Sequence, residues 1–139
     1  MIHDLTDQGD IVVEHVFSGD LLVGPGGGSG TCATTVRFQE QRVLFDPSPG
    51  ETIGSSVWLR QSSGGIYHVD AGSFSNSDWT AYDSGQLTAA DFTPSGLDLC
   101  PSSPSTITFG YSRSSTNASA GTTLFQSHGI DEWSVTISP

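Results

Sequence analysis

Residues 106–112 read Thr106-Ile107-Thr108-Phe109-Gly110-Tyr111-Ser112, in which apolar side chains alternate with small polar ones. Successive side chains of a β-strand point to opposite faces of the sheet, so the isoleucine, phenylalanine and tyrosine of this segment share one face. Such strands occur in antiparallel sheets that bury one face and expose the other. We therefore predict a half-buried strand here.

The rest of the chain repeats this pattern in short runs rich in Val, Ile, Thr, Phe and Trp, separated by clusters of Gly, Pro, Ser and Asp. No segment sustains an apolar stripe at helical spacing. The one helical signal is a single turn over residues 87–92, where Thr88 and Asp91 form a capping-box arrangement. The expected strands are 11–17, 21–23, 33–39, 41–45, 56–61, 65–69, 80–82, 106–112 and 133–137.

Strands without helices, in a chain of 139 residues, indicate one domain of ordinary size. The sequence predicts an all-β fold over residues 1–139, a two-sheet antiparallel β-sandwich. The expected core contains large apolar side chains from several strands: Phe38, Phe45, Leu59, Ile107, Phe109, Trp133, Val135 and Ile137.

Charge is one-sided: 15 acids face four arginines (Arg37, Arg42, Arg60 and Arg113), there is no lysine, and the formal net charge is -11. Such a chain repels phosphate backbones and anionic membrane surfaces, so nucleic acid is excluded as a partner. No apolar run approaches the roughly 20 residues needed to span a bilayer, so membrane insertion is not expected.

Two cysteines, Cys32 and Cys100, lie far apart and outside any C-x-x-C pair, and two lone thiols cannot build a zinc site. The acidic, lysine-free composition suits a secreted or cell-surface protein, where the economical interpretation is a Cys32–Cys100 disulfide. The alternative is two buried, reduced cysteines packed as small apolar groups. Residues 2–7 show neither the basic start nor the apolar core of a secretion signal, so either a signal was removed or export is wrong.

Alternation also predicts which way side chains point. Trp133, Val135 and Ile137 share an inward face, which places Asp131, two residues earlier, on the same side. In the strand around residues 57–60, Trp58 and Arg60 share one face; either Trp58 is exposed beside the guanidinium or this strand is buried on both sides.

Five segments together resemble a family of exported bacterial β-sandwich domains, mostly uncharacterised, of jelly-roll or concanavalin A-like type. They are Gly64-Gly65-Ile66-Tyr67-His68-Val69, Phe74-Ser75-Asn76-Ser77-Asp78-Trp79-Thr80, Leu87-Thr88-Ala89-Ala90-Asp91-Phe92, Ile107-Thr108-Phe109-Gly110-Tyr111 and His128-Gly129-Ile130-Asp131-Glu132-Trp133-Ser134-Val135. The resemblance covers roughly the last three quarters of the chain and implies fold and habitat rather than an activity. The chain departs from the family at Glu132, where asparagine is common, and at Cys100.

A calcium site is implied by a second resemblance. Many jelly-roll carbohydrate-binding modules are similar to this chain in ending on an Ile-Asp-x-aromatic strand, whose aspartate helps to hold a structural calcium ion with a residue of the first strand. Asp131 matches that aspartate, and Glu14 or Asp10 is the expected partner. The alternative is that Asp131 accepts hydrogen bonds from backbone amides or from an arginine.

Catalytic patterns are weak. Asp131 and Glu132 are adjacent on a strand and point apart, so they cannot form the carboxylate pair of a glycosidase. The histidines show no metal-ligand spacing, and no nucleophile turn accompanies them. We therefore expect no enzymatic activity.

Recognition of a ligand is the favoured function, because β-sandwich modules stack sugar rings on exposed aromatic side chains and add a few polar groups. The candidate ligand-binding residues are Trp58, Arg60, Tyr67, Trp79 and Tyr82, with Tyr67 joining Trp58 on an outer face if their strands pair. The alternative for Trp58, Tyr67 and Trp79 is that they fill the core. The sequence predicts a noncatalytic extracellular module for a polysaccharide or surface glycan; the alternative is a structural subunit of a fibre, surface layer or matrix, with protein partners or copies of itself.

Overall fold

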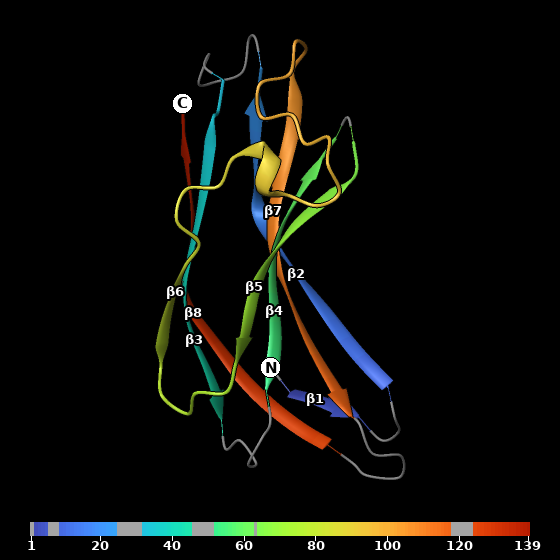
Figure 1. Cartoon of the computed structure of the whole chain (residues 1–139), viewed down its shortest axis with the longest axis vertical. Helices are drawn as coiled ribbons and strands as arrows, with labels where there is room; N and C mark the ends of the chain where they lie inside the picture. The colour runs from blue at the N-terminus through green and yellow to red at the C-terminus, as the bar shows by residue number, and fades with distance from the viewer. Residues whose placement is uncertain (1, 6–8, 25–31, 46–51, 63, 118–123) are drawn as a thin grey trace.

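The computed structural model describes residues 2–5, 9–24, 32–45, 52–62, 64–117 and 124–139. Its secondary structure is almost entirely β, as predicted (Figure 1). The elements in chain order are β1 (Ile2–Leu5), β2 (Gly9–Val23), β3 (Thr35–Phe45), β4 (Ile53–Gln61), β5 (Ile66–Phe74), β6 (Thr80–Asp83), the 3₁₀ turn η1 (Ala89–Asp91), β7 (Ser105–Asn117) and β8 (Leu124–Ser138).

The strands pair as if the chain were one long hairpin rolled up on itself. The first pairs with the last, β1 with β8, and the pairing continues inward through β2 with β7, β3 with β6 and β4 with β5, always antiparallel. Two further pairs, β3 with β8 and β4 with β7, complete sheet A (β1-β8-β3-β6) and sheet B (β2-β7-β4-β5). This strand order makes the sandwich a jelly roll.

The predicted strands are present, and two predicted interruptions are absent. Residues 11–17 and 21–23 belong to one strand, β2, whose register shifts between Val16 and Asp20. Residues 33–39 and 41–45 likewise overlap a single continuous β3. A change of register within a strand leaves it extended, whereas the sequence pattern alone suggested a break. The first strand, β1, precedes every strand that the sequence predicted.

The upper half of the sandwich in Figure 1 encloses an apolar core. Its fully buried members come from both sheets and include Val36, Phe38, Leu59 and Ile107, with the rings of Phe38 and Phe109 packed edge to face. Trp133, Val135 and Ile137 of β8 are half-buried against this cluster. The predicted core is therefore confirmed at Phe38, Leu59, Ile107 and Phe109, and in part along β8.

The lower half of the interior contains a buried ion pair. Arg113 of β7 and Glu40 of β3 face each other from opposite sheets, both side chains essentially inaccessible, with Nη2 of Arg113 donating to Oε2 of Glu40 at 2.7 Å. Arg113 also donates to Ser55 of β4 at 2.6 Å, and its guanidinium lies 5.6 Å from the centre of the Phe74 ring. A buried ion pair requires such additional partners, because both charges have lost their water.

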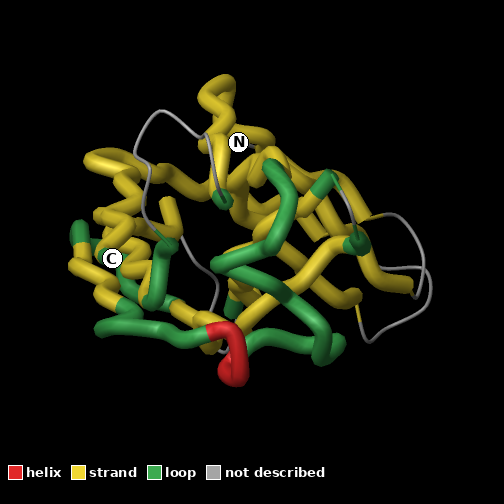
Figure 2. Tube along the Cα trace, turned by 90° about the horizontal axis from the view of Figure 1, so that it is seen from above, coloured by secondary structure: helices red, strands yellow, loops and turns green. Residues whose placement is uncertain are grey.

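The connection between β6 and β7 closes one side edge of the sandwich. Leu87 exchanges two backbone hydrogen bonds of 2.8 Å with Val36 of β3, and Thr93 exchanges bonds of 2.8 and 2.9 Å with His68 of β5, so residues 84–104 bridge sheets A and B. Figure 2, which views the molecule from above, shows this connection as the green loop on both sides of the red 3₁₀ turn. Phe92, Leu97 and Leu99 from this connection are buried in the apolar core.

Two local predictions in this region are confirmed. The carboxylate of Asp91 accepts hydrogen bonds from the Thr88 amide at 2.7 Å and from the Thr88 hydroxyl at 2.8 Å, which caps the predicted turn and lowers the pKa of Asp91. Cys32 and Cys100 form the predicted disulfide, with their Cα atoms 4.5 Å apart. The bond fastens the chain just ahead of β3 to the β6–β7 connection.

Two predictions of facing are wrong. Phe45 is 46% exposed rather than buried, because it lies on the outer face of β3. Asp131 is exposed rather than inward. Gln39 pairs with Ser134 but Gln41 pairs with Asp131, so β8 contains one extra residue at this point. A β-bulge of this kind reverses the alternation of inward and outward side chains. The inward direction inferred for Asp131 from that of Trp133 is therefore wrong.

Candidate functional site

The outer face of sheet A carries a continuous array of side chains. Residues directly opposite each other on paired strands share a face, so the register of β6, β3 and β8 gives the rows of this array. One row is Asp83, Gln39 and Ser134, and the next is Ala81, Gln41 and Asp131. Further along β3 the face continues through Val43, opposite Gly129, and then Phe45, opposite Ser127.

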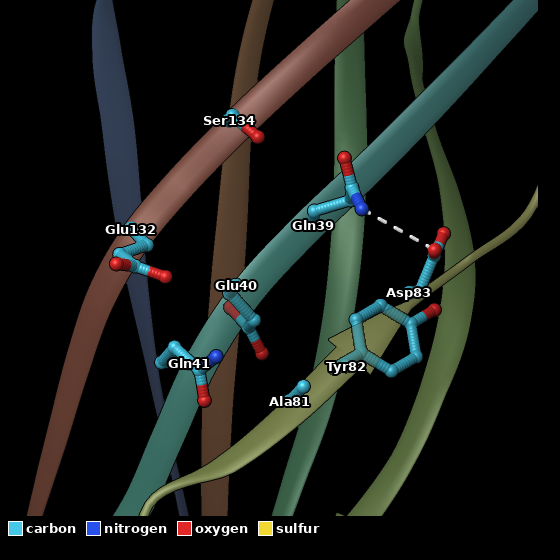
Figure 3. A pocket seen from close by; sticks show the side chains of 8 residues that line it. All are labelled: Gln39, Glu40, Gln41, Ala81, Tyr82, Asp83, Glu132 and Ser134. Carbon is cyan, nitrogen blue, oxygen red and sulfur yellow. Dashed lines mark hydrogen bonds between the residues drawn. The ribbon is translucent and has the colours of Figure 1, made fainter.

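A shallow groove of about 370 Å³ runs across the polar rows. Gln39 and Gln41 on β3 form its middle, Asp83 lies on the β6 side, and Glu132 and Ser134 lie on the β8 side (Figure 3). The small side chain of Ala81 leaves the space open. The groove therefore offers two planar amides, two carboxylates and a hydroxyl from three adjacent strands.

Aromatic side chains continue this face. Trp79, just before β6, is 50% exposed, and its ring meets that of Phe45 edge to face with centroids 6.3 Å apart. Gly129 makes this contact possible, because a Cβ atom there would lie 2.9 Å from Trp79, 3.0 Å from Val43 and 3.1 Å from Phe45. An exposed Trp–Phe pair thus lies on the same outer face as the polar groove, beyond the row that contains Val43.

The β-bulge in β8 shapes the groove. Glu132 has a φ of +51°, a left-handed conformation that costs a residue with a side chain about 1–2 kcal/mol. Its amide donates to Oδ1 of Asp131 at 2.8 Å, which helps to hold that conformation. Asp131 thus accepts a backbone hydrogen bond, which was the expected alternative to calcium binding. The bulge also brings Glu132 into the wall of the groove.

Charged residues beneath the groove fix its middle strand. Glu40, between the two groove glutamines, points inward to Arg113, and Tyr82, between Ala81 and Asp83, lies under the guanidinium of Arg42 at 4.8 Å. Burial raises the pKa of Tyr82 and lowers that of Arg42. Two of the three strands of the groove, β3 and β6, are therefore anchored from below by side chains that alternate with those facing outward.

Asp83 is held at the rim by an ion pair. Both of its carboxylate oxygens accept from Arg37, one of them from Nε at 2.8 Å, and Nε2 of Gln39 donates to it at 3.3 Å. The Arg37 guanidinium and the amide of Gly85 hold the pKa of Asp83 well below its usual range. Asp83 is therefore a fixed carboxylate, available as a hydrogen-bond acceptor but not as a proton donor.

The structure separates the five candidate ligand-binding residues. Trp79 lies on the outer face of sheet A, and Arg60 is exposed on the outer face of sheet B, 5.7 Å over the ring of Trp58. Trp58 itself is only 2% exposed, so its strand is buried on both sides. Tyr67 pairs with Leu59, not Trp58, and faces the core, where its hydroxyl donates to the carbonyl of Gly96 at 3.2 Å. The predicted Trp58–Tyr67 surface is therefore wrong. Tyr82 is half-buried, with the guanidinium of Arg42 over its ring.

The proposed calcium ligands belong to strands of different sheets. Asp131 lies on β8 in sheet A, whereas Asp10 and Glu14 lie on β2 in sheet B, and the side chains of the latter two fall outside the described residues. The described part of the chain contains no group of three or more His, Cys, Asp or Glu side chains placed to hold a metal ion. Calcium binding stays a prediction.

Sequence reasoning missed most of the groove. Gln39, Gln41, Asp83 and Ser134 were not proposed, and Glu132 was considered only as a departure from the resembled family and as a neighbour of Asp131. The alternation of Phe38, Glu40 and Arg42 with Gln39 and Gln41 was nevertheless visible. The missing information was the pairing of β3 with both β6 and β8, which no local pattern contains.

No family model matches the chain, and no curated protein or solved structure matches it either. Within the described residues, no helix has the length and apolar character needed to cross a membrane.

Proposed function

We propose that this protein is a noncatalytic, secreted or cell-surface recognition module that binds a polysaccharide or surface glycan on the outer face of sheet A. The observation that carries the proposal is the polar groove of Gln39, Gln41, Asp83, Glu132 and Ser134 beside the exposed Trp79–Phe45 pair. Amides and carboxylates hydrogen-bond sugar hydroxyls, and an aromatic ring covers the apolar face of a pyranose.

The ionised state of Asp83 suits it to accept hydrogen bonds and not to act as the proton donor of a glycosidase. A glycosidase needs one carboxylic acid with a raised pKa as its proton donor. Asp83 has the opposite property, because Arg37 holds its pKa low and keeps it ionised. The disulfide, which persists in oxidising compartments, supports the extracellular setting.

The test is a glycan-array scan of the intact protein followed by titration calorimetry with the best ligand. Trp79→Ala is expected to weaken binding by about five- to thirtyfold, since stacking on a ring contributes on the order of 1–2 kcal/mol. Gln41→Ala is expected to have a similar effect, because that amide lies at the centre of the groove.

Ile66→Ala is the matched control, because Ile66 is also an exposed large apolar residue but belongs to sheet B. Its affinity should equal that of the unmodified protein. Equal losses for Trp79→Ala and Ile66→Ala, or an array without any ligand, would rule out this site. Thermal unfolding measured with calcium and with a chelator tests the calcium prediction separately, since an ion bound only to the native state raises its stability.

A second candidate function, a structural subunit of a fibre, surface layer or matrix, is favoured by one separate observation. Among the described strands, the upper part of β8 pairs with β3 alone, and sheet edges are where chains join by strand addition.

A further inference from the structure

The β-bulge of β8 places two consecutive carboxylates on the outer face of sheet A. Adjacent residues of a regular strand point to opposite faces. Here, Asp131 lies opposite Gln41 in the outer rows, and the next residue, Glu132, lines the groove. Both are exposed. Together with Asp83 on β6, three carboxylates of the described residues therefore lie in or beside the groove (Figure 3).

Of these three carboxylates, Asp83 alone has an arginine as its partner, which is Arg37. The chain contains no lysine. Its other three arginines lie in the interior or on the outer face of sheet B: Arg42, Arg113 and Arg60. Asp131 and Glu132 are therefore exposed to solvent without an arginine or lysine to neutralise them.

The aromatic part of the same face also suits a cation. An indole ring attracts ammonium groups more strongly than the other aromatic side chains do. Trp79 is 50% exposed, and within the described residues no arginine lies over its ring. The rings that the arginines do contact are others: Trp58, Phe74, Tyr82 and Tyr111. Trp79 reaches Gly129, two residues before Asp131 and thus about 7 Å from it along β8, so one ligand can contact both the indole and the carboxylate.

The length of this face indicates a chain of sugars and not a single one. Gln41, at the centre of the groove, and Phe45, the partner of Trp79, are four residues apart on β3, which corresponds to about 13 Å. One sugar ring is too small to contact both. A linear oligosaccharide that runs along β3 contacts the polar groove and the aromatic pair at the same time.

We propose that the ligand of this groove is a linear glycan of amino sugars whose free amino groups are protonated, an inference that rests on the glycan-binding function proposed above. Its ammonium groups would lie beside Glu132 and Asp131, and the apolar face of one ring would stack on Trp79. The same carboxylates, in a chain with a net charge of -11, disfavour glycans that carry uronate or sulfate groups.

The test compares four β-1,4-linked oligosaccharides of equal length, each long enough to reach from Asp83 to Phe45. They are oligomers of glucosamine, N-acetylglucosamine, glucose and glucuronic acid. The first three have the same ring stereochemistry and differ only in the substituent on the second ring carbon. Binding to the intact protein is measured by titration calorimetry. One exposed ion pair changes affinity by up to about fivefold, so we expect the glucosamine oligomer to bind about five- to twentyfold more tightly than the glucose oligomer, and the glucuronate oligomer to bind most weakly.

Two double variants show where this preference arises. Asp131→Asn with Glu132→Gln removes both charges and retains the oxygen that accepts the amide of residue 132. The affinities for the glucosamine and glucose oligomers should then agree within about twofold. Asp70→Asn with Asp98→Asn is the matched control. It also removes two exposed carboxylates that each accept a backbone amide, but from β5 and from the β6–β7 connection, so the preference should persist.

Different results would overturn different parts of the proposal. Equal affinities for the glucosamine and glucose oligomers, both weakened by Trp79→Ala, would remove the amino-sugar preference and leave the glycan-binding function in place. The same loss of preference in both double variants would attribute it to the net charge of the chain. A linear polyamine that binds as tightly as the glucosamine oligomer would show that the site recognises cations without regard to sugar rings. Absence of binding by every oligosaccharide, together with an array without any ligand, would remove the proposed function as well.

Discussion

The two halves of the sandwich interior are held together by different forces. The upper half is apolar, with Phe38, Leu59 and Ile107 at its centre, and the disulfide and the β6–β7 connection close over it. The lower half is built around the Arg113–Glu40 ion pair, with a small apolar cluster of Leu44, Ile53 and Phe74 beside it. Apolar burial is not directional, whereas a hydrogen-bonded ion pair fixes the relative position of its two strands.

This difference matters for the outer surface. Glu40 alternates with Gln39 and Gln41, so the ion pair that joins β3 to β7 also positions the residues that line the groove. Because apolar burial is the dominant favourable contribution to folding, we expect the apolar half to contribute most of the stability and the charged half to position the proposed binding face. Changes in the two halves should therefore have distinguishable effects.

The largest effect is expected from removing one partner of the ion pair. Glu40→Ala leaves the buried Arg113 guanidinium, and Arg42 beside it at 3.8 Å from Oε1 of Glu40, without a buried carboxylate. Loss of one member of a buried pair costs about 3–5 kcal/mol. Urea denaturation should show this loss, and Gln39→Ala, one residue away on the outer face, should change stability by less than about 0.5 kcal/mol.

A double substitution sharpens the same comparison. Glu40→Leu combined with Arg113→Met replaces both charges with apolar groups, and such replacements of buried pairs are often neutral or stabilising. We expect a protein that folds at least about as stably as the unmodified one but binds its glycan more weakly. Unchanged glycan affinity in the double variant would show that the ion pair does not position the groove.

The apolar half should respond to lost volume. Leu59→Ala removes a fully buried side chain at the centre of the upper core and should cost about 2–5 kcal/mol, through lost burial and the cavity left behind. Leu59→Met, which conserves volume, should cost less than about 1.5 kcal/mol. Similar costs for the two variants, measured by thermal unfolding, would mean that this core is not tightly packed.

The sequence predicted the apolar half better than the charged half, for a physical reason. Strands such as 106–112 and 56–61 carry their facing in their own alternation, and the core at Leu59, Ile107 and Phe109 followed from it. The Cys32–Cys100 bond was predicted because no other pairing exists within the chain.

The charged half depends on long-range register. The sequence indicated that a buried carboxylate near β8 would need a partner, but it assigned that role to Asp131, whereas the buried carboxylate is Glu40. The bulge opposite Glu40 is what reverses the facing of Asp131, and a bulge arises from the pairing of two strands rather than from either strand alone. The outer groove was missed for the same reason.

The disulfide reinforces the apolar half only. Replacing both cysteines by serine removes a link between residues separated by 68 positions in the sequence. The free energy of unfolding should fall by about 2–4 kcal/mol. The loss should concentrate where the bond is attached: amides of residues 97–99 should exchange faster, while those around Arg113 should keep their protection. Uniformly faster exchange across both halves would mean that the interior unfolds as a single unit and that the distinction between halves has no energetic counterpart.

The smallest effect is expected at Glu132, on the bulge above the ion pair. Its left-handed conformation costs a residue with a Cβ atom about 1–2 kcal/mol, and glycine adopts it freely, although glycine loses about 0.5–1 kcal/mol more entropy on folding. Glu132→Gly should therefore stabilise the protein by up to about 1 kcal/mol, whereas Glu132→Ala, which keeps the strain, should leave stability nearly unchanged. Both variants remove the carboxylate from the groove, so both should weaken glycan binding equally. The two variants separate backbone strain from ligand binding. If Glu132→Gly is no more stable than Glu132→Ala in urea, the bulge is not strained. If only one of the two variants loses affinity for the glycan, the backbone conformation of the bulge, and not the carboxylate, determines binding.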